Sequence, residues 1–192
     1  MICMRPANLR LFLLSCLILV SCTSEKVSPG VGDHWHVTYD FYICDRWVGT
    51  VSETDELGNP TNKVLGIYHV HGHDDGLMHW HPSTNAAGGN KATLGLYLSF
   101  YEILLDDVQI TLPNYLGGTV LEGLTVCETA NGQVDGVLTV QLFEPGKTTP
   151  IVYTDNLAAT LLNRDGLSVT VVFGPAGTSP GLPPSFSTAP ND

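Results

Sequence analysis

The sequence predicts an α+β domain that is built mainly from antiparallel strands and contains one helix. Most of its apolar stretches are short, rich in β-branched and aromatic residues, and separated by turn dipeptides such as Asn131-Gly132 and Pro145-Gly146. This is the pattern of strands joined by tight turns. One stretch instead repeats its apolar residues every three or four positions, as a helix does.

The predicted strands are the segments that are densest in Val, Ile, Thr, Tyr and Phe. In chain order they are residues 34–44, 64–71, 77–81, 108–112, 119–127, 134–143 and 168–173. We expect the helix over residues 92–105, where Thr93 can cap the first turn. The helical spacing is carried by Leu94, Leu98, Tyr101 and Leu105. Gly95 should weaken this helix by up to about 1 kcal/mol.

The end of the domain has the rhythm of a β-grasp module. A strand ends at Glu144-Pro145-Gly146, residues 156–162 follow, and the turn Asp165-Gly166 leads into a closing strand. In β-grasp modules such a turn leads into a final, central strand, although a β-sandwich would fit the same pattern. Residues 176–192 are rich in Pro, Gly, Ser and Thr, and we expect a tail that is disordered or follows the surface.

The N-terminus carries the features of an export signal. Arg5 and Arg10 precede an uncharged stretch, residues 11–20, which is too short to span a bilayer as a helix but suits a signal-peptide core. The residues before Cys22 resemble the lipobox of bacterial lipoproteins, in which the chain is cut before the cysteine and the cysteine is acylated. An ordinary secretory signal that leaves Cys22 free, or an uncleaved anchor, is the alternative.

We therefore divide the chain into four parts. They are a signal peptide (1–21), a lipidated anchor and spacer (22–32), a single globular domain (33–175) and the Pro-rich tail (176–192). With about 140 residues, the domain is large enough for one core. This organisation predicts an exported protein that is held on the outer side of a membrane by acyl chains.

The charge of the chain excludes some classes of partner. The full chain has a formal net charge of −11 at pH 7. Loss of the signal peptide removes two arginines and no acid, which leaves six basic residues against nineteen acids and a net charge of −13. No basic stripe remains to neutralise phosphates, so we expect no binding to nucleic acid and no electrostatic docking on anionic lipid.

Two of the five cysteines remain in the predicted domain. Cys3 and Cys16 leave with the signal peptide and Cys22 is the lipidation site, so Cys44 and Cys127 are left. Two thiols in an oxidising compartment most simply form a disulfide bond. The alternative is that both thiolates bind a metal beside the histidines.

All seven histidines lie between residues 34 and 81. They form three groups: His34-Trp35-His36, His69-Val70-His71-Gly72-His73 and His79-Trp80-His81. Alternate residues of a strand point to the same face, about 6.5 Å apart, so a His-X-His pair can place two imidazoles on one ion. Imidazole suits zinc, copper and nickel alike, and we expect zinc or copper.

The register of the predicted hairpin decides which histidines share a face. If residues 72–76 are its loop, His71 pairs with Leu77 and His69 lies opposite His79. This register puts four histidines on one face: His69, His71, His79 and His81. A slip by one residue would split them between two faces.

Other residues are expected around this face. A neighbouring first strand would add His34 or His36 to it. Carboxylates can bind the ion directly or orient a ligand ring, and the candidates are Asp33, Asp74 and Asp75. His73 is expected to stand apart in the loop. The alternating tryptophans should point to the opposite face and pack in the core; they are Trp35 and Trp80.

Several motifs together resemble a group of uncharacterised actinobacterial envelope proteins. The motifs are Asp33-His34-Trp35-His36, Tyr42-Ile43-Cys44-Asp45, Gly66-Ile67 with His69 and His71, Asp75-Gly76-Leu77-Met78-His79-Trp80-His81-Pro82, Ala92-Thr93-Leu94-Gly95, and Phe173-Gly174-Pro175 with Pro183-Pro184-Ser185. The resemblance implies an N-terminally anchored protein of the cell envelope without an assigned activity. This chain departs from the group in its lipobox-like signal and in its longer loop at His73-Asp74.

Three functions fit these patterns. The first is a metal-binding lipoprotein of the cell envelope. The second is a metal-dependent hydrolase in which Asp74 or Asp75 acts on metal-bound water. No glutamate base, nucleophile motif or phosphate loop is evident, so an enzyme is the weaker hypothesis. The third is a protein-interaction module whose histidines are structural or respond to pH.

Overall fold

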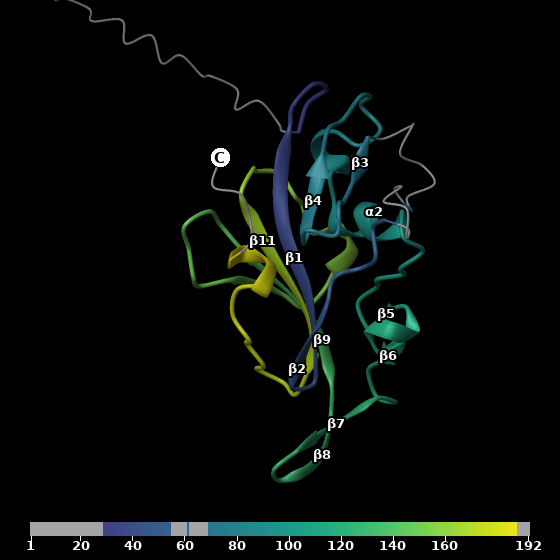
Figure 1. The fold of residues 1–192 in the computed structure, drawn as a ribbon. Coiled ribbons are helices and arrows are strands. Elements are labelled where there is room, and N and C mark those ends of the chain that lie inside the picture. The colour runs from purple at the N-terminus through teal and green to yellow at the C-terminus, as the bar shows by residue number, and fades with distance from the viewer. Residues whose placement is uncertain (1–28, 55–60, 62–68, 188–192) are drawn as a thin grey trace, which may run out of the picture.

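The structure, a computed structural model, describes residues 29–54, 61 and 69–187 and has the predicted α+β fold (Figure 1). The signal peptide, Cys22 and most of the strand predicted at 64–71 lie outside the described residues. In the part of the chain that is described, α2 (Leu94–Ser99) is the only α-helix. The described chain also contains four short 3-10 helices: η1 (Gly89–Lys91) before α2, and η2 (Asn114–Leu116), η3 (Leu157–Ala159) and η4 (Pro184–Ser187) after it.

The main sheet has the strand order β10-β9-β11-β1-β4-β3, and β2 also pairs with β1. Its strands are β1 (Trp35–Ile43), β2 (Arg46–Gly49), β3 (Val70–His71), β4 (Leu77–Trp80), β9 (Val137–Phe143), β10 (Ile151–Tyr153) and β11 (Leu167–Gly174). Only β1 and β11 pair in parallel, and the other pairings of this sheet are antiparallel. The closing strand is central, as the Asp165-Gly166 turn predicted.

Two hairpins lie outside the main sheet. They are β5 (Gln109–Thr111) with β6 (Thr119–Leu121), and β7 (Val126–Thr129) with β8 (Gly132–Asp135). The β7–β8 hairpin projects beyond the end of the sheet at the bottom of Figure 1.

Alternation along β1 gives the sheet two different faces. Trp35, Val37, Tyr39 and Phe41 are buried in the hydrophobic core. α2 packs on this face, where the ring centroids of Tyr39 and Tyr97 are 5.4 Å apart. The intervening residues of β1, from His36 to Tyr42, face the other way, because successive side chains of a strand alternate.

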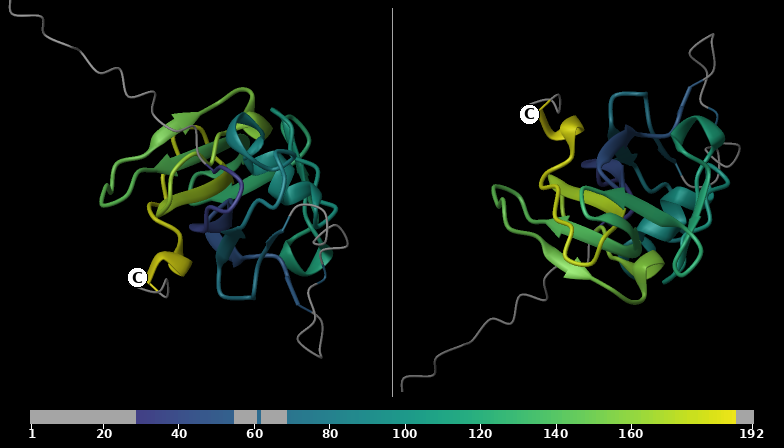
Figure 2. Two further views of the ribbon diagram at one scale, coloured as in Figure 1. Left: turned by 90° about the horizontal axis from the view of Figure 1, so that it is seen from above. Right: turned by 90° about the horizontal axis from the view of Figure 1, so that it is seen from below.

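The Pro-rich segment after β11 covers part of the opposite face (Figure 2). Ser185 donates a hydrogen bond to the Tyr39 carbonyl (3.0 Å), and Thr170 donates one to the Gly181 carbonyl (3.0 Å). As far as it is described, this segment follows the surface of the sheet. It leaves uncovered the part of this face that carries the histidines of β1, β3 and β4.

Three elements differ from the prediction for identifiable reasons. The helix stops at Ser99 instead of residue 105, since Glu102 adopts a φ of 61° that a right-handed helix cannot contain. The stretch 119–127 is divided into β6 and β7 by a turn at Gly123, whose φ is 74°. The stretch 134–143 is divided at Gly136, where a Cβ would lie 2.2 Å from the Phe173 ring.

Helix α2 begins as predicted and uses its glycine for packing. The Thr93 hydroxyl accepts a hydrogen bond from the Leu96 N–H (3.2 Å). A Cβ at Gly95 would lie 2.7 Å from the Ala158 Cβ, so glycine permits the close approach of η3. The loss of helix propensity at this position is therefore offset by tertiary packing.

Cys44 and Cys127 form a disulfide bond, as expected for an oxidising compartment. Cys44 follows the end of β1, about 26 Å along the strand from His36 near its start. The alternative in which both thiolates bind a metal beside the histidines is therefore wrong. Within the described part of the chain, no helix has the length and apolar character needed to span a bilayer.

Replacing both cysteines, Cys44→Ser with Cys127→Ser, should lower the free energy of unfolding by roughly 4 to 5 kcal/mol, because the disulfide closes a long loop in the unfolded chain. Urea unfolding of both proteins, with and without reductant, measures this. The control is the effect of reductant, which should lower the free energy of unfolding of the wild type and leave that of the double variant unchanged. A loss below 1 kcal/mol would contradict the expectation.

Candidate metal centre

The strands β1, β4 and β3 bring the histidines onto the sheet face opposite the core. His36 pairs with His79 across β1 and β4, and His71 pairs with His79 across β3 and β4. The tryptophans point the other way and are buried, as predicted: Trp35 and Trp80. The face that carries the imidazoles is therefore fixed by the burial of the residues between them.

The register of β3 and β4 differs by two residues from the predicted one. His71 lies opposite His79 instead of Leu77, and the His69 carbonyl accepts a hydrogen bond from the His81 N–H (3.0 Å). The connection is longer than residues 72–76 because Leu77 and Met78 pair only with β1. A shift of two residues preserves the face of every side chain, so the histidines remain together.

Six of the seven imidazoles form a closed ring, which we call the histidine ring. The ring centroids of successive members are separated by 4.6 Å (His34–His36), 4.7 Å (His36–His79), 4.6 Å (His79–His73), 4.7 Å (His73–His71), 5.2 Å (His71–His81) and 3.8 Å (His81–His34). The ring thus draws on both strand pairings and on the loop after β3.

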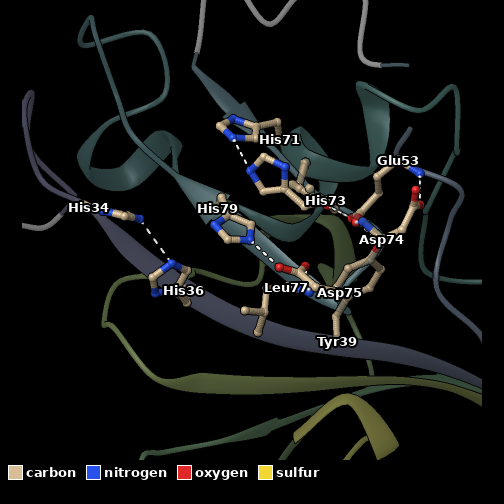
Figure 3. Close-up of polar contacts among 12 residues, drawn as sticks. His34, His36, Tyr39, Glu53, His71, His73, Asp74, Asp75, Leu77 and His79 are labelled. Carbon is tan, nitrogen blue, oxygen red and sulfur yellow. Dashed lines mark hydrogen bonds and ion pairs between the residues drawn. The ribbon is translucent and has the colours of Figure 1, made fainter. Parts of the chain in front are cut away.

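Two pairs of nitrogen atoms converge within the histidine ring (Figure 3). Nε2 of His34 lies 3.1 Å from Nε2 of His36, and Nε2 of His71 lies 3.1 Å from Nε2 of His73. Two imidazole nitrogens that bind one tetrahedral ion at 2.0–2.1 Å lie about 3.3 Å apart. Each pair is therefore close to the geometry that a shared ion requires.

One group of three histidines could hold a metal ion. His34, His36 and His79 each offer one nitrogen, and these nitrogens lie within 4.8 Å of one another. His79 is largely buried, with 11% of its side chain exposed, whereas His34 is exposed. An ion at this position would be reached from solvent beside His34 and supported from below by the sheet.

Asp75 orients His79. Its Oδ2 lies 2.9 Å from Nε2 of His79, and its Oδ1 accepts a hydrogen bond from the Leu77 N–H (3.0 Å). A carboxylate on one imidazole nitrogen fixes the tautomer and makes the other nitrogen a better ligand. Nδ1 of His79 is the nitrogen that remains for an ion, as expected if Asp75 supports a ligand.

The closing turn of the domain positions His36. The His36 N–H donates to Oδ1 of Asp165 (2.6 Å), and the Gly166 N–H donates to the His36 carbonyl (2.9 Å). The Asp165-Gly166 turn thus holds the backbone of a candidate ligand as well as starting β11.

The other candidate residues have different places. His73 belongs to the histidine ring, although its position in the loop predicted otherwise. His69 is exposed and adopts a φ of 54°. Among the described interactions, no aromatic contact joins its imidazole to the six imidazoles of the histidine ring. Asp33 accepts a hydrogen bond from the Gly30 N–H (2.7 Å) and so closes a turn at the start of the domain.

Asp74 binds the loop that follows β3 and carries His73, which we call the histidine loop, to the segment that contains Glu53 and Thr54. Its Oδ1 accepts from the Glu53 N–H (2.6 Å), and its Oδ2 accepts from the Thr54 N–H (3.1 Å) and hydroxyl. Both oxygens are thus used in holding the loop away from a tight hairpin, which explains the longer connection between β3 and β4.

The pKa values favour neutral imidazoles inside the histidine ring. Burial lowers the pKa of His71 and of His81 to about 4, and neighbouring histidines add to the effect. Burial also lowers the pKa of His79, although Asp75 opposes this. These three imidazoles are therefore neutral at neutral pH, which is the form that binds a metal.

Glu53 is a buried carboxyl group beneath the histidine loop that sequence reasoning missed. It is fully buried and accepts hydrogen bonds from the hydroxyls of Tyr39 (2.7 Å) and Tyr97 and from the Asp74 N–H (2.9 Å). A Cβ at Gly72 would lie 1.8 Å from its Cδ, so glycine is required there. A lone glutamate outside any motif gave no signal in the sequence.

Burial raises the pKa of Glu53 to about 7, from 4.5. The folded state then binds more protons than the unfolded state between these pH values, so this residue makes unfolding easier as pH rises through that window. Glu53→Gln removes this contribution. As pH rises from 4.5 to 7, the unfolding free energy of the variant should therefore increase by about 3 kcal/mol relative to that of the wild type.

Urea unfolding of both proteins across this pH range measures the difference. The lowered pKa values of the histidines make the free energy of unfolding rise with pH, opposite to the effect of Glu53. This contribution is the same in both proteins and cancels in the difference between them. A constant difference between the two proteins would show that Glu53 does not titrate there.

No protein-family model matches this chain, and no curated protein or solved structure is significantly similar to it. The functional argument therefore rests on the geometry of the histidine ring.

Proposed function

We propose that this protein is an extracytoplasmic lipoprotein that binds a transition metal ion, zinc or copper, through the histidine ring. His34, His36 and His79 are the ligands of this ion in the proposal. The observation that carries it is the convergence of their three nitrogens within 4.8 Å of one another.

The composition of the histidine ring supports metal binding over a purely structural role. Neutral imidazoles each carry one acceptor nitrogen that needs a donor. In the described structure Asp75 is the carboxylate bonded to the ring, and Nδ1 of His71 is buried without a hydrogen-bond partner. Without an ion, protonation would create repulsion between neighbours, whereas a bound cation satisfies several lone pairs at once.

Binding explains the surroundings better than hydrolysis. A metal-dependent hydrolase needs a carboxylate that is free to act on metal-bound water. Asp74 is engaged with the backbone of Glu53 and Thr54, and Asp75 is engaged with His79 and Leu77. Neither candidate base is left for the reaction, so we infer binding or carriage of the ion.

The proposed extracytoplasmic location is supported by the cysteines and the charge of the chain. The Cys44–Cys127 disulfide suits an oxidising compartment. The lipobox-like residues before Cys22 support anchoring by acyl chains, and the group of envelope proteins that the histidine motifs resemble is also anchored at the N-terminus. An excess of acidic residues also favours attraction of cations to the domain.

Metal content tests this function. The full-length protein, incubated with Zn²⁺ at neutral pH and dialysed, should retain at least one ion per chain by elemental analysis. The double variant His34→Ala with His79→Ala should bind this ion more than tenfold more weakly, because two of three ligands are gone.

His69→Ala is the matched control, since His69 is exposed and outside the histidine ring. It should bind Zn²⁺ as the wild type does. A wild-type protein that retains no ion, or a control that loses as much as the double variant, would overturn the proposed function.

A further inference from the structure

We propose that His71 and His73 hold a second metal ion, separate from the ion at His34, His36 and His79. The inference rests on the proposed function, because it assigns a further ion to the same histidine ring. It deepens that function by making the protein a carrier of two ions in unequal sites.

The geometry of the second pair matches that of the first. Nε2 of His71 and Nε2 of His73 lie 3.1 Å apart, the same separation as between His34 and His36. With bonds of 2.0–2.1 Å, this separation corresponds to an angle of about 100° at the ion. A bent arrangement of this kind suits tetrahedral or square-planar coordination and does not suit linear coordination.

The second pair is spatially distinct from the first. In Figure 3, His34 with His36 and His71 with His73 lie on different sides of His79. The centroid of the His79 ring is 4.7 Å from that of His36 and 4.6 Å from that of His73. In the described part of the chain, the group of nitrogens that converge within 4.8 Å includes neither His71 nor His73.

His79 cannot easily serve both ions. Asp75 occupies its Nε2, so a single nitrogen remains, and we assign it to the ion at His34 and His36 because His79 belongs to the group that converges with them. His81 stacks on His71, with ring centroids 5.2 Å apart, but in the described part of the chain no third residue forms a converging group with His71 and His73. The ion between His71 and His73 therefore has two protein ligands. Its other coordination positions are open to water or to a small anionic or imidazole-like ligand from solution.

The two sites should differ in affinity. The first has a largely buried ligand, His79, that is held by Asp75. In the second, Nδ1 of His71 has no hydrogen-bond partner, and His73 is exposed. Loss of such outer support typically costs 10–100-fold in metal affinity, so the second ion should be the weaker and more exchangeable one.

Equilibrium dialysis of the full-length protein against Zn²⁺, with elemental analysis, tests the inference. The wild type should bind two ions per chain, the second at least tenfold more weakly than the first. His73→Ala should lose the weaker ion and keep the tighter one. His34→Ala should weaken the tighter ion and keep the weaker one, and His69→Ala should keep both.

The three substituted histidines, His34, His69 and His73, are exposed, so the variants should fold, and circular dichroism verifies this. His73→Gln, which keeps a polar side chain of similar reach, should behave as His73→Ala does. One ion per chain in the wild type, or two ions in His73→Ala and His73→Gln, would overturn the second site and leave the proposed function intact. No bound ion in the wild type would overturn both.

Discussion

The burial of Val70 and Trp80 on the core side of the sheet determines where the histidines lie. Val70 pairs with Trp80 across β3 and β4, and both side chains are fully buried. Because strand side chains alternate, every histidine next to these residues must face the other way. Reversing this choice would expose large apolar side chains, at a cost of roughly 2 to 3 kcal/mol each, and would bury the imidazoles.

A second constraint holds the loop that completes the histidine ring. Glu53 lies against Gly72 and accepts the Asp74 N–H, while Asp74 accepts the Glu53 N–H. The hydrogen bonds hold Asp74 on one side of His73, and packing against Glu53 holds Gly72 on the other. A buried carboxyl group thus contributes to the candidate metal centre without touching the ion, because it sets the path of the chain that carries a ligand.

Much of the fold could be predicted because local patterns agreed with the tertiary structure. The density of β-forming residues identified β1 and β4, the Thr93 cap identified the start of α2, and the Asp165-Gly166 turn identified the central closing strand. Strand breaks were missed where they depend on distant contacts. Gly136 lies where the predicted strand 134–143 is divided, and the need for glycine there depends on the distant Phe173 ring, which occupies the space beside it.

The candidate site was predictable in composition but not in detail. Period-two spacing is sufficient to place the histidines on one face, and a register shift of two residues leaves that result unchanged. The membership of His73, however, depends on a loop held by Asp74 and by a buried Glu53 that belongs to no motif. Such long-range polar contacts have no periodic signature in the sequence.

X-ray absorption spectroscopy at the zinc edge tests the central claim most directly, on full-length protein that carries one equivalent of Zn²⁺. The expected spectrum has nitrogen ligands at about 2.0–2.1 Å together with the outer-shell scattering of about three imidazole rings. A first shell of oxygen atoms alone, without imidazole scattering, would contradict the assignment of His34, His36 and His79 as ligands.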